Sequence, residues 1–376
     1  MNYFLTRRAA LKWLETPSIY QIAKDELYEL DEESFRFLKK CDSADGCPSK
    51  DGAFTDYCVD EGLLTAETSN LRRPCLMQSP VPSLRYLELQ ITDACNLRCK
   101  HCYINSARPH ELSQKQIQDL LKEFSDMQGL RVLITGGEPL IHSRFEAINE
   151  ILPDYFLRKV LFTNGILLTQ DLLKTLKVDE IQISIDGLES AHEAVRGSGT
   201  YKRSMDAVKL ALDAGFAVSI STMVHRANFG DFDDMEQLFH NMGIKDWTVD
   251  VPCTTGRLRE NIDLQVAPEE AGRYLGYGYG GGMHATVQGF GCGYHLMSVM
   301  ADGKIAKCTF YHDQSVGTIH NGLREAWKKI IPVQLRELSC NCDYIDVCRG
   351  GCRYRAALLN GRSGKDSYRC TLYGII

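Results

Sequence analysis

The chain has 376 residues, of which 44% are hydrophobic and 24% charged, and its formal net charge is −6. This composition is that of a globular protein of two or three domains, and the acidic balance gives no general electrostatic reason to bind nucleic acid. The sequence has no apolar run near the roughly 20 residues that a membrane span needs, and its N-terminus lacks the features of a signal peptide. We therefore expect a cytoplasmic location, with neither membrane nor nucleic-acid partners.

The first 78 residues predict a small α+β domain. Its predicted elements are strands at 18–22 and 26–30, helices at 32–41 and 53–64, and a proline-containing linker at 72–83. Asp31 precedes the first helix and is expected to cap it. The cysteines of this region lack the tight spacing of a ligand set, and we interpret them as ordinary cysteines: Cys41, Cys47, Cys58 and Cys75.

Residues 79–285 predict an α/β domain in which apolar, β-branched runs alternate with amphipathic stretches. The predicted strands are 86–92, 130–136, 159–164, 180–186, 217–224 and 247–252. The predicted helices between them are 113–127, 171–177, 204–215 and 231–243. This alternation indicates parallel strands with right-handed crossovers, in an open doubly wound sheet or an incomplete β/α barrel. In both architectures the chemistry lies at the carboxyl ends of the strands.

The loop after the first of these strands, "CNLRCKHCY" (95–103), contains three closely spaced cysteines. The chain has fifteen cysteines, and in a reducing compartment metal or redox chemistry is favoured over a disulfide framework. Three thiolates on one loop can hold a four-iron cluster and leave one iron open to an exogenous chelator. A zinc knuckle is the alternative, in which His101 would be the fourth ligand from inside the turn.

This loop and the motifs that follow it resemble the signature of the radical S-adenosylmethionine (radical SAM) superfamily. The resemblance implies a partial (β/α)6 TIM-type barrel whose [4Fe-4S] cluster is held by Cys95, Cys99 and Cys102. In that family the open iron is chelated by the amino and carboxylate groups of SAM. The reduced cluster cleaves SAM to a 5′-deoxyadenosyl radical, which abstracts a hydrogen atom from the substrate.

The resemblance also implies SAM contacts on the loops "TGGEP" (135–139), "FTNG" (162–165) and "SIDG" (184–187) and on "EAVRGSGTY" (193–201). The implied cofactor-binding residues are Tyr103, Gly136, Gly137, Glu138, Asn164, Ser184, Asp186 and Arg196. Glu138 would bind the SAM amino group and Arg196 its carboxylate. The alternatives are helix N-capping for Asn164 and Asp186, and a solvated surface position for Arg196.

The C-terminal segment 286–376 is rich in cysteine, with the spacing Cys292-x10-Gly303-x4-Cys308, then Cys340-x-Cys342-x5-Cys348-x3-Cys352-x17-Cys370. It resembles the SPASM extension, an iron–sulfur domain of radical SAM enzymes that modify peptides, except that Cys340 lies one residue late. The resemblance implies two auxiliary [4Fe-4S] clusters. One would be held by Cys292, Cys308 and Cys352, and the other by Cys340, Cys342, Cys348 and Cys370.

The first auxiliary cluster is one ligand short in this assignment. It would be open to a substrate thiolate or a backbone group, or be closed by another residue. Cys253 is a candidate for that residue only if the chain folds back toward it. A structural zinc site is the alternative for the cysteine-rich tail.

The segment 18–41 resembles the RiPP recognition element, a winged-helix domain that pairs an extended leader peptide with an exposed strand edge. A helical cap over the barrel is the alternative. Together the resemblances imply a peptide maturase that oxidatively modifies a ribosomally made peptide, with flavodoxin or ferredoxin as electron donor. A thioether crosslink from cysteine is the first expectation. Carbon–carbon crosslinking, formylglycine-type oxidation, a tetrapyrrole side-chain reaction and a non-catalytic peptide-binding module are alternatives. No residue is identified as a general base.

Overall fold

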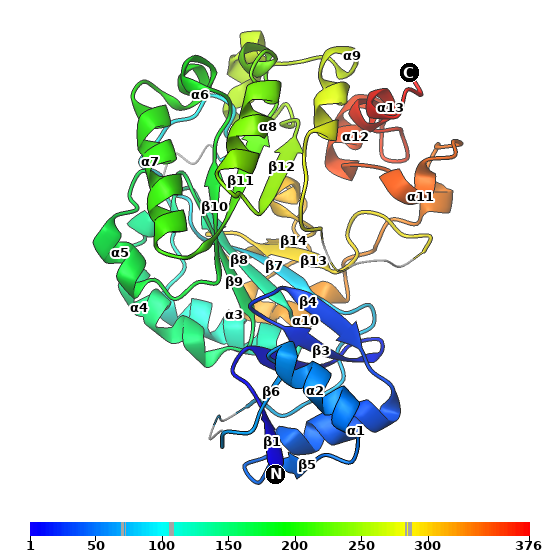
Figure 1. The fold of residues 1–376 in the computed structure, drawn as a ribbon. Coiled ribbons are helices and arrows are strands. Elements are labelled where there is room, and N and C mark those ends of the chain that lie inside the picture. The colour runs from blue at the N-terminus through cyan, green and yellow to red at the C-terminus, as the bar shows by residue number, and fades with distance from the viewer. Residues whose placement is uncertain (69–70, 72, 105–108, 283, 285–287) are drawn as a thin grey trace.

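A large sheet forms the centre of the computed structural model, which describes residues 1–68, 71, 73–104, 109–282, 284 and 288–376 (Figure 1). Within these residues its strand order is β12-β11-β10-β9-β8-β7-β13-β14-β15. The first six strands in this order are β12 (Asp246–Asp250), β11 (Ala217–Met223), β10 (Glu180–Ser184), β9 (Arg158–Thr163), β8 (Arg131–Gly136) and β7 (Tyr86–Thr92). Every pairing among these six is parallel, which confirms the prediction of a barrel-like parallel sheet.

Helices connect these strands and lie along the outside of the sheet (Figure 1). They are α3 (Gln114–Asp126), α4 (Phe145–Ile151), α5 (Gln170–Thr175), α6 (Glu189–Arg196), α7 (Thr200–Asp213) and α8 (Phe232–Asn241). Their apolar faces pack on the strands in one core, which includes Leu89, Ile134 and Phe124. Helix α7 begins four residues earlier than predicted, because Gly199 takes up a left-handed conformation with φ 73° that starts the helix at Thr200.

The C-terminal segment adds three strands to the same sheet: β13 (Leu296–Val299), β14 (Lys304–Ala306) and β15 (Gly317–Thr318). Strand β13 pairs in parallel with β7, so the sheet continues past residue 286, where the sequence predicted a domain boundary. The remaining helices are short: α9 (Pro268–Ala271), α10 (Leu323–Trp327), α11 (Ile345–Cys348), α12 (Arg353–Asn360) and α13 (Ser367–Leu372). Figure 1 shows α11, α12 and α13 gathered at the C-terminal side of the molecule.

The N-terminal region forms a separate small unit with its own core (Figure 1). Its elements are β1 (Asn2–Leu5), β2 (Ala9–Trp13), β3 (Pro17–Gln21), β4 (Glu26–Glu29), α1 (Glu32–Cys41), β5 (Cys47–Pro48), α2 (Gly52–Asp60) and β6 (Leu64–Thr65). Asp31 caps α1 as predicted, since its side chain accepts a hydrogen bond of 2.8 Å from the Ser34 amide. Strands β1 and β2 were not predicted, because residues 1–15 mix charged with apolar residues. Cys41 and Cys58 are buried in this core, in agreement with their interpretation as ordinary cysteines.

Strand β2 attaches this unit to the barrel through the buried Lys12. Its ammonium donates to the carbonyl oxygens of Gly129 (2.7 Å) and Phe156 (3.2 Å). From the barrel side, the Arg158 guanidinium donates to the carbonyl oxygen of Ile22 (2.8 Å) and to Glu180 (2.6 Å). Buried charges of this kind are stable only when paired, so they fix the unit against the amino ends of the barrel strands. None of the helices in the described residues has the length and apolar character required to cross a membrane.

Candidate active site

A cavity of about 280 Å³ opens at the carboxyl ends of the parallel strands. Most of the residues that the sequence singled out line it. They are Cys95, Cys99, Cys102, Tyr103, Gly136, Gly137, Asn164, Ser184 and Arg196. The structure therefore brings the three-cysteine loop and four separate strand ends to one place, as the parallel topology requires.

The three-cysteine loop is fixed by contacts to neighbouring loops. The Arg257 guanidinium donates to the carbonyl oxygens of Cys99 (2.8 Å) and Ile104 (2.9 Å). The Lys100 amide donates to the carbonyl oxygen of Val195 at 2.9 Å. Three thiols are thus held on an ordered backbone, where they can act together as ligands.

Gly136 and Gly137 support the same loop from below. The amide of Gly137 donates to the carbonyl oxygen of Thr92, and that of Glu138 to the carbonyl oxygen of Ala94, both at 2.8 Å. A Cβ atom at either glycine would lie 2.2 Å from one of these two oxygens. The glycines of "TGGEP" are therefore needed for the close approach of the cysteine loop itself, whatever ligand they also contact.

Glu138 is fully buried behind the cavity wall. Its carboxylate accepts hydrogen bonds from the Thr163 hydroxyl and the Asn164 amide, both at 2.9 Å. Burial raises the pKa of Glu138 to about 7, against the lowering effect of these donors. The carboxylate joins the ends of β8 and β9, and its predicted contact with the SAM amino group stays a prediction.

Arg196 and Asp186 form a buried ion pair beside the cysteines. Arg196 Nε lies 2.6 Å from Asp186 Oδ2, and its Nη1 lies 4.0 Å from the Cys99 sulfur. The alternative of a solvated surface arginine is wrong, because the Arg196 side chain is only 10% exposed. Burial opposes the ionisation of Asp186, but Arg196 and His101 outweigh it and hold the pKa of this carboxyl below its ordinary value. Asp186 thus positions the guanidinium that faces Cys99.

The N-capping alternatives for Asn164 and Asp186 are also wrong. Asn164 Nδ2 donates to Asn96 Oδ1 at 2.8 Å, which ties the end of β9 to the cysteine loop. Helices α5 and α6 have Thr169 and Leu188 at their N-cap positions instead. His101, the alternative zinc ligand, points its Nε2 toward Asp186 at 3.6 Å. Within the described residues, no three His, Cys, Asp or Glu side chains are arranged to hold a single metal ion.

Three residues that the sequence did not assign to this site also line the cavity: Glu88, Cys253 and Arg257. Glu88 is the carboxylate of a strand that is otherwise apolar, and this is the signal that could have identified it. It accepts hydrogen bonds from the Ser298 hydroxyl and, at 3.0 Å, from the Thr309 amide. Burial raises the pKa of Glu88.

The cysteines of the tail fall into two spatial groups. Cys340, Cys342, Cys348 and Cys370 all line one small cavity between α11 and α13. Cys292, Cys308 and Cys352 lie near one another around Tyr311. Burial is the main cause that raises the pKa of the Cys292 thiol to about 11. The grouping is the one that the resemblance implied.

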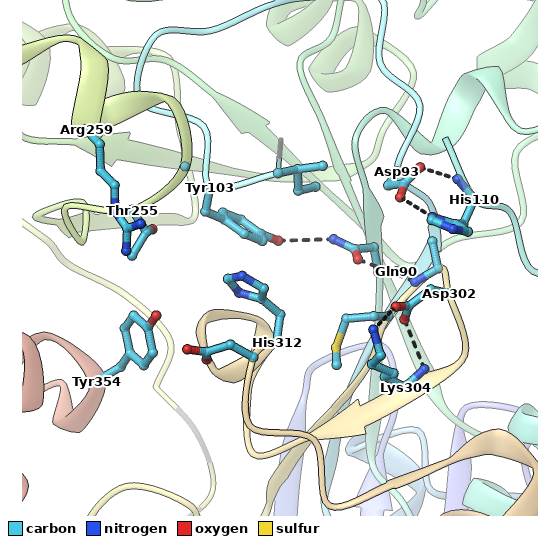
Figure 2. Close-up of a pocket in the computed structure, with 15 residues that line it drawn as sticks. Gln90, Asp93, Tyr103, His110, Thr255, Arg259, Asp302, Lys304, His312 and Tyr354 are labelled. Carbon is cyan, nitrogen blue, oxygen red and sulfur yellow. Dashed lines mark hydrogen bonds and ion pairs between the residues drawn. The ribbon is translucent and has the colours of Figure 1, made fainter. Parts of the chain in front are cut away.

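A second cavity, of about 480 Å³, lies next to the first and shares Tyr103 with it (Figure 2). The Tyr103 hydroxyl accepts a hydrogen bond from Gln90 at 3.3 Å, and its ring packs against Phe310 at 5.5 Å. Figure 2 shows His312 near Tyr103, with Tyr354 on one side and the ion-paired Lys304 and Asp302 on the other. Its volume is within the range of about 300–1,000 Å³ that is usual for ligand sites.

Comparison with known proteins decides the family of the core. Residues 89–239 match the model of the Radical SAM superfamily. The chain contains a radical SAM domain. It is accordingly a radical SAM enzyme, and its family uses a [4Fe-4S] cluster and SAM. The match includes the three-cysteine loop, "TGGEP", "FTNG" and "SIDG".

Two curated relatives and one solved structure extend beyond this domain. The AdoMet-dependent heme synthase of Nitratidesulfovibrio vulgaris is 26% identical, over 77% of this chain and 92% of its own length. The mycofactocin maturase MftC of Mycolicibacterium smegmatis is 28% identical, over 71% and 77%. The crystal structure of Streptococcus suis SuiB bound to precursor peptide SuiA has a TM-score of 0.71 at 13% identity, over 97% of this chain and 98% of that one. The likeness to SuiB shows a common fold.

The donor set of the first cavity fits the cluster and cofactor of the family. Cys95, Cys99 and Cys102 offer three thiolates at one point, and the positively charged Arg196 is buried beside Cys99. Gly136 and Gly137 leave the adjoining wall free of side chains, where a ligand can lie against the backbone.

Proposed function

We propose that this radical SAM enzyme is a peptide maturase that oxidatively modifies a ribosomally made precursor peptide. The observation that carries the proposal is the meeting of the three-cysteine loop and the "TGGEP" loop in one cavity, beside a second cavity of substrate size. Cys95, Cys99 and Cys102 would hold the cluster, and the remaining lining residues would hold SAM. When bound, the cluster and SAM supply a 5′-deoxyadenosyl radical for hydrogen abstraction.

The protein's own part is to position and shield. Arg196 offers its charge to the thiolate side of the site and, as predicted, to the SAM carboxylate. Tyr103 and Phe310 stand between the two cavities, where their rings exclude water from the reacting groups. The second cavity is where we place the reacting residue of the peptide, with His312 and Tyr354 in its wall.

The tail would hold the two auxiliary [4Fe-4S] clusters. The cavity lined by Cys340, Cys342, Cys348 and Cys370 supports a four-ligand site, despite the late position of Cys340 in the sequence pattern. The group of Cys292, Cys308 and Cys352 supports a second site closer to the barrel. This arrangement is the reason to assign a SPASM-type domain to residues 286–376.

The N-terminal unit would bind the leader of the precursor peptide. Within the described residues, β4 is the outer strand of the sheet β2-β3-β4. An edge strand can receive an extended peptide through backbone hydrogen bonds. The likeness to SuiB, whose crystal structure contains a precursor peptide, covers this unit as well and supports the assignment.

A second candidate is a side-chain reaction on a tetrapyrrole, which the likeness to AdoMet-dependent heme synthase favours. The edge strand β4 argues for the peptide, since a tetrapyrrole substrate has no need of a strand partner. The two are separated by adding each substrate to the reduced enzyme and following which one is consumed with 5′-deoxyadenosine.

The first test is the mass of a short precursor peptide encoded beside the enzyme and expressed with it without oxygen. We expect the loss of two hydrogens per modification, because each crosslink removes two hydrogens from the peptide. The variant Cys99→Ala should leave the peptide unchanged, since it removes one ligand of the cluster that cleaves SAM. Alkylation of thiols then shows whether a cysteine is consumed, as a thioether crosslink requires.

An unmodified peptide together with accumulating 5′-deoxyadenosine would contradict the choice of peptide and keep the radical SAM chemistry. No 5′-deoxyadenosine from a protein that contains its clusters would contradict the enzymatic proposal and leave a peptide-binding module.

The substitution Glu29→Pro tests the leader-binding strand. The hydrogen bond from the Leu30 amide to the Pro17 carbonyl and the register of β3 and β4 place the Glu29 amide on the side away from β3. Proline removes this outward donor without removing a bond to β3. We expect the affinity for a synthetic leader peptide to fall roughly 3- to 10-fold, the equivalent of about 1 kcal/mol.

The control for this prediction is Glu29→Ala, which removes the same carboxylate and keeps the amide. Fluorescence anisotropy with a labelled leader compares the two variants. Equal affinities would show that the leader does not pair with β4.

A further inference from the structure

Cys253 lies just after β12, at the carboxyl ends of the parallel strands, and is only 3% exposed. Its thiol lies within hydrogen-bonding reach of the Cys352 thiol, which begins α12 in the tail. Cys352 is one of the three cysteines grouped around Tyr311. The fold therefore brings a fourth sulfur to the group of Cys292, Cys308 and Cys352.

A buried ion network holds the two segments in this register. Arg355, one turn after Cys352, donates to Asp250 Oδ1 at 2.7 Å and to the Val251 carbonyl at 2.8 Å. It also pairs with Asp366 at 2.8 Å, and Asp366 in turn accepts the Cys352 amide at 2.8 Å. Arg355 and Asp366 are each only 3% exposed. Buried charges joined in this way define one arrangement, so the contact of Cys253 with Cys352 is built into the fold.

Two other roles for Cys253 are less consistent with its surroundings. It lines the cavity of the three-cysteine loop, yet its closest charged and thiol neighbours are Cys352, Arg355 and Asp250. Binding to the cluster of that loop would also close the iron that SAM needs. Glu88 is the other buried anion near Cys308, but its carboxylate already accepts hydrogen bonds from Ser298 and Thr309.

We propose that the Cys253 thiolate is the fourth protein ligand of the auxiliary cluster held by Cys292, Cys308 and Cys352, so that this cluster has no iron open to a substrate thiol. The inference rests on the proposed function in one respect, since it assumes an auxiliary cluster at this group. Both cysteine side chains turn about their Cα–Cβ bonds between staggered positions, which lets the sulfurs separate around a cluster.

This ligand changes the expected reaction. The preference for a thioether crosslink depended on an open iron that could bind a substrate cysteine. A cluster closed by four cysteines removes that reason. It favours a carbon–carbon crosslink or another oxidation in which the peptide contributes no thiol.

The test uses the full chain with Cys95, Cys99 and Cys102 replaced by alanine, so that only the auxiliary clusters contribute to the spectrum. Iron content and the EPR spectrum after dithionite reduction are measured with and without cyanide, a small ligand for open iron sites. We expect the spectrum of this protein to be unchanged by cyanide. Addition of Cys253→Ala should create a cyanide-dependent signal or remove up to about four irons per chain.

Cys58→Ala is the matched control, because Cys58 is also buried (1% exposed) but lies in the N-terminal core. A cyanide response before Cys253 is replaced would overturn the proposal, and this measurement does not depend on how the Cys253 variant folds. Identical iron content and spectra for the Cys253 and Cys58 variants would overturn it as well. If Cys292→Ala also leaves the iron content unchanged, the auxiliary cluster itself is absent and the assumption fails rather than the ligand assignment alone.

Discussion

Replacement of Gly137 by alanine is expected to abolish SAM cleavage while the protein stays folded. The new Cβ would lie 2.2 Å from the carbonyl oxygen of Ala94, the residue before Cys95. Backbone atoms cannot give way as a flexible side chain can, so the cysteine loop must move. A displacement of about 1 Å at a reacting centre can cost roughly 100-fold in rate, and a displaced ligand set also binds its cluster less well.

Formation of 5′-deoxyadenosine and iron content measure the effect of Gly137→Ala. Gly230→Ala is a suitable control, since a Cβ there meets no atom within 4 Å. We expect Gly230→Ala to retain full activity and iron. If Gly137→Ala retains both, the cysteine loop does not depend on the close approach seen in the structure.

Replacement of Arg158 by methionine is expected to lower the free energy of unfolding by about 3–5 kcal/mol, the usual cost of removing one partner of a buried ion pair. Arg158 is fully buried and pairs with Glu180 at 2.6 Å. Without the guanidinium, the Glu180 carboxylate keeps only the hydrogen bond from Ser219, at 2.7 Å. The carbonyl oxygens of Ile22 and Ala23 would also lose their donor, so the N-terminal unit would be held less firmly.

Urea unfolding of the single variants Arg158→Met and Glu180→Gln and of the double variant measures this coupling. We expect the double variant to lose less than the sum of the two single variants, because it leaves no unpaired buried charge. Arg36→Met is the control, since Arg36 pairs with Glu32 on an exposed helix surface and should change stability by less than about 1 kcal/mol. Equal effects of Arg158→Met and Arg36→Met would show that Arg158 is not an anchor between the two units.

Several predictions from the sequence depend on short segments, and these agree with the structure. The six barrel strands were placed to within about two residues, because buried parallel strands are continuous apolar runs between polar loops. Asp31 was identified as a helix cap from its immediate neighbours. The metal-binding loop was recognised from three cysteines within nine residues, a spacing that carries its own geometry.

Other predictions left two readings open, and burial decided between them. Arg196 could be a ligand-facing or a solvated arginine, and the sequence around it fits both. In the structure it lies against Asp186 and Cys99, which come from two other loops. Glu88 was overlooked because one charged residue in an apolar strand has no local partner; its donors, Ser298 and Thr309, lie far along the chain.

The sequence by itself determined the parallel α/β core, the three-cysteine loop and the two sets of cysteines in the tail, since each depends on periodicity or spacing within a few residues. Only the tertiary structure decided that β13 joins β7, that Lys12 reaches the carbonyl oxygens of Gly129 and Phe156, and that Cys253 meets Cys352. Each of these contacts joins segments far apart in the chain. Their pairing depends on the path of the backbone and on which buried charges and sulfurs find partners, and no local pattern of residues records that choice.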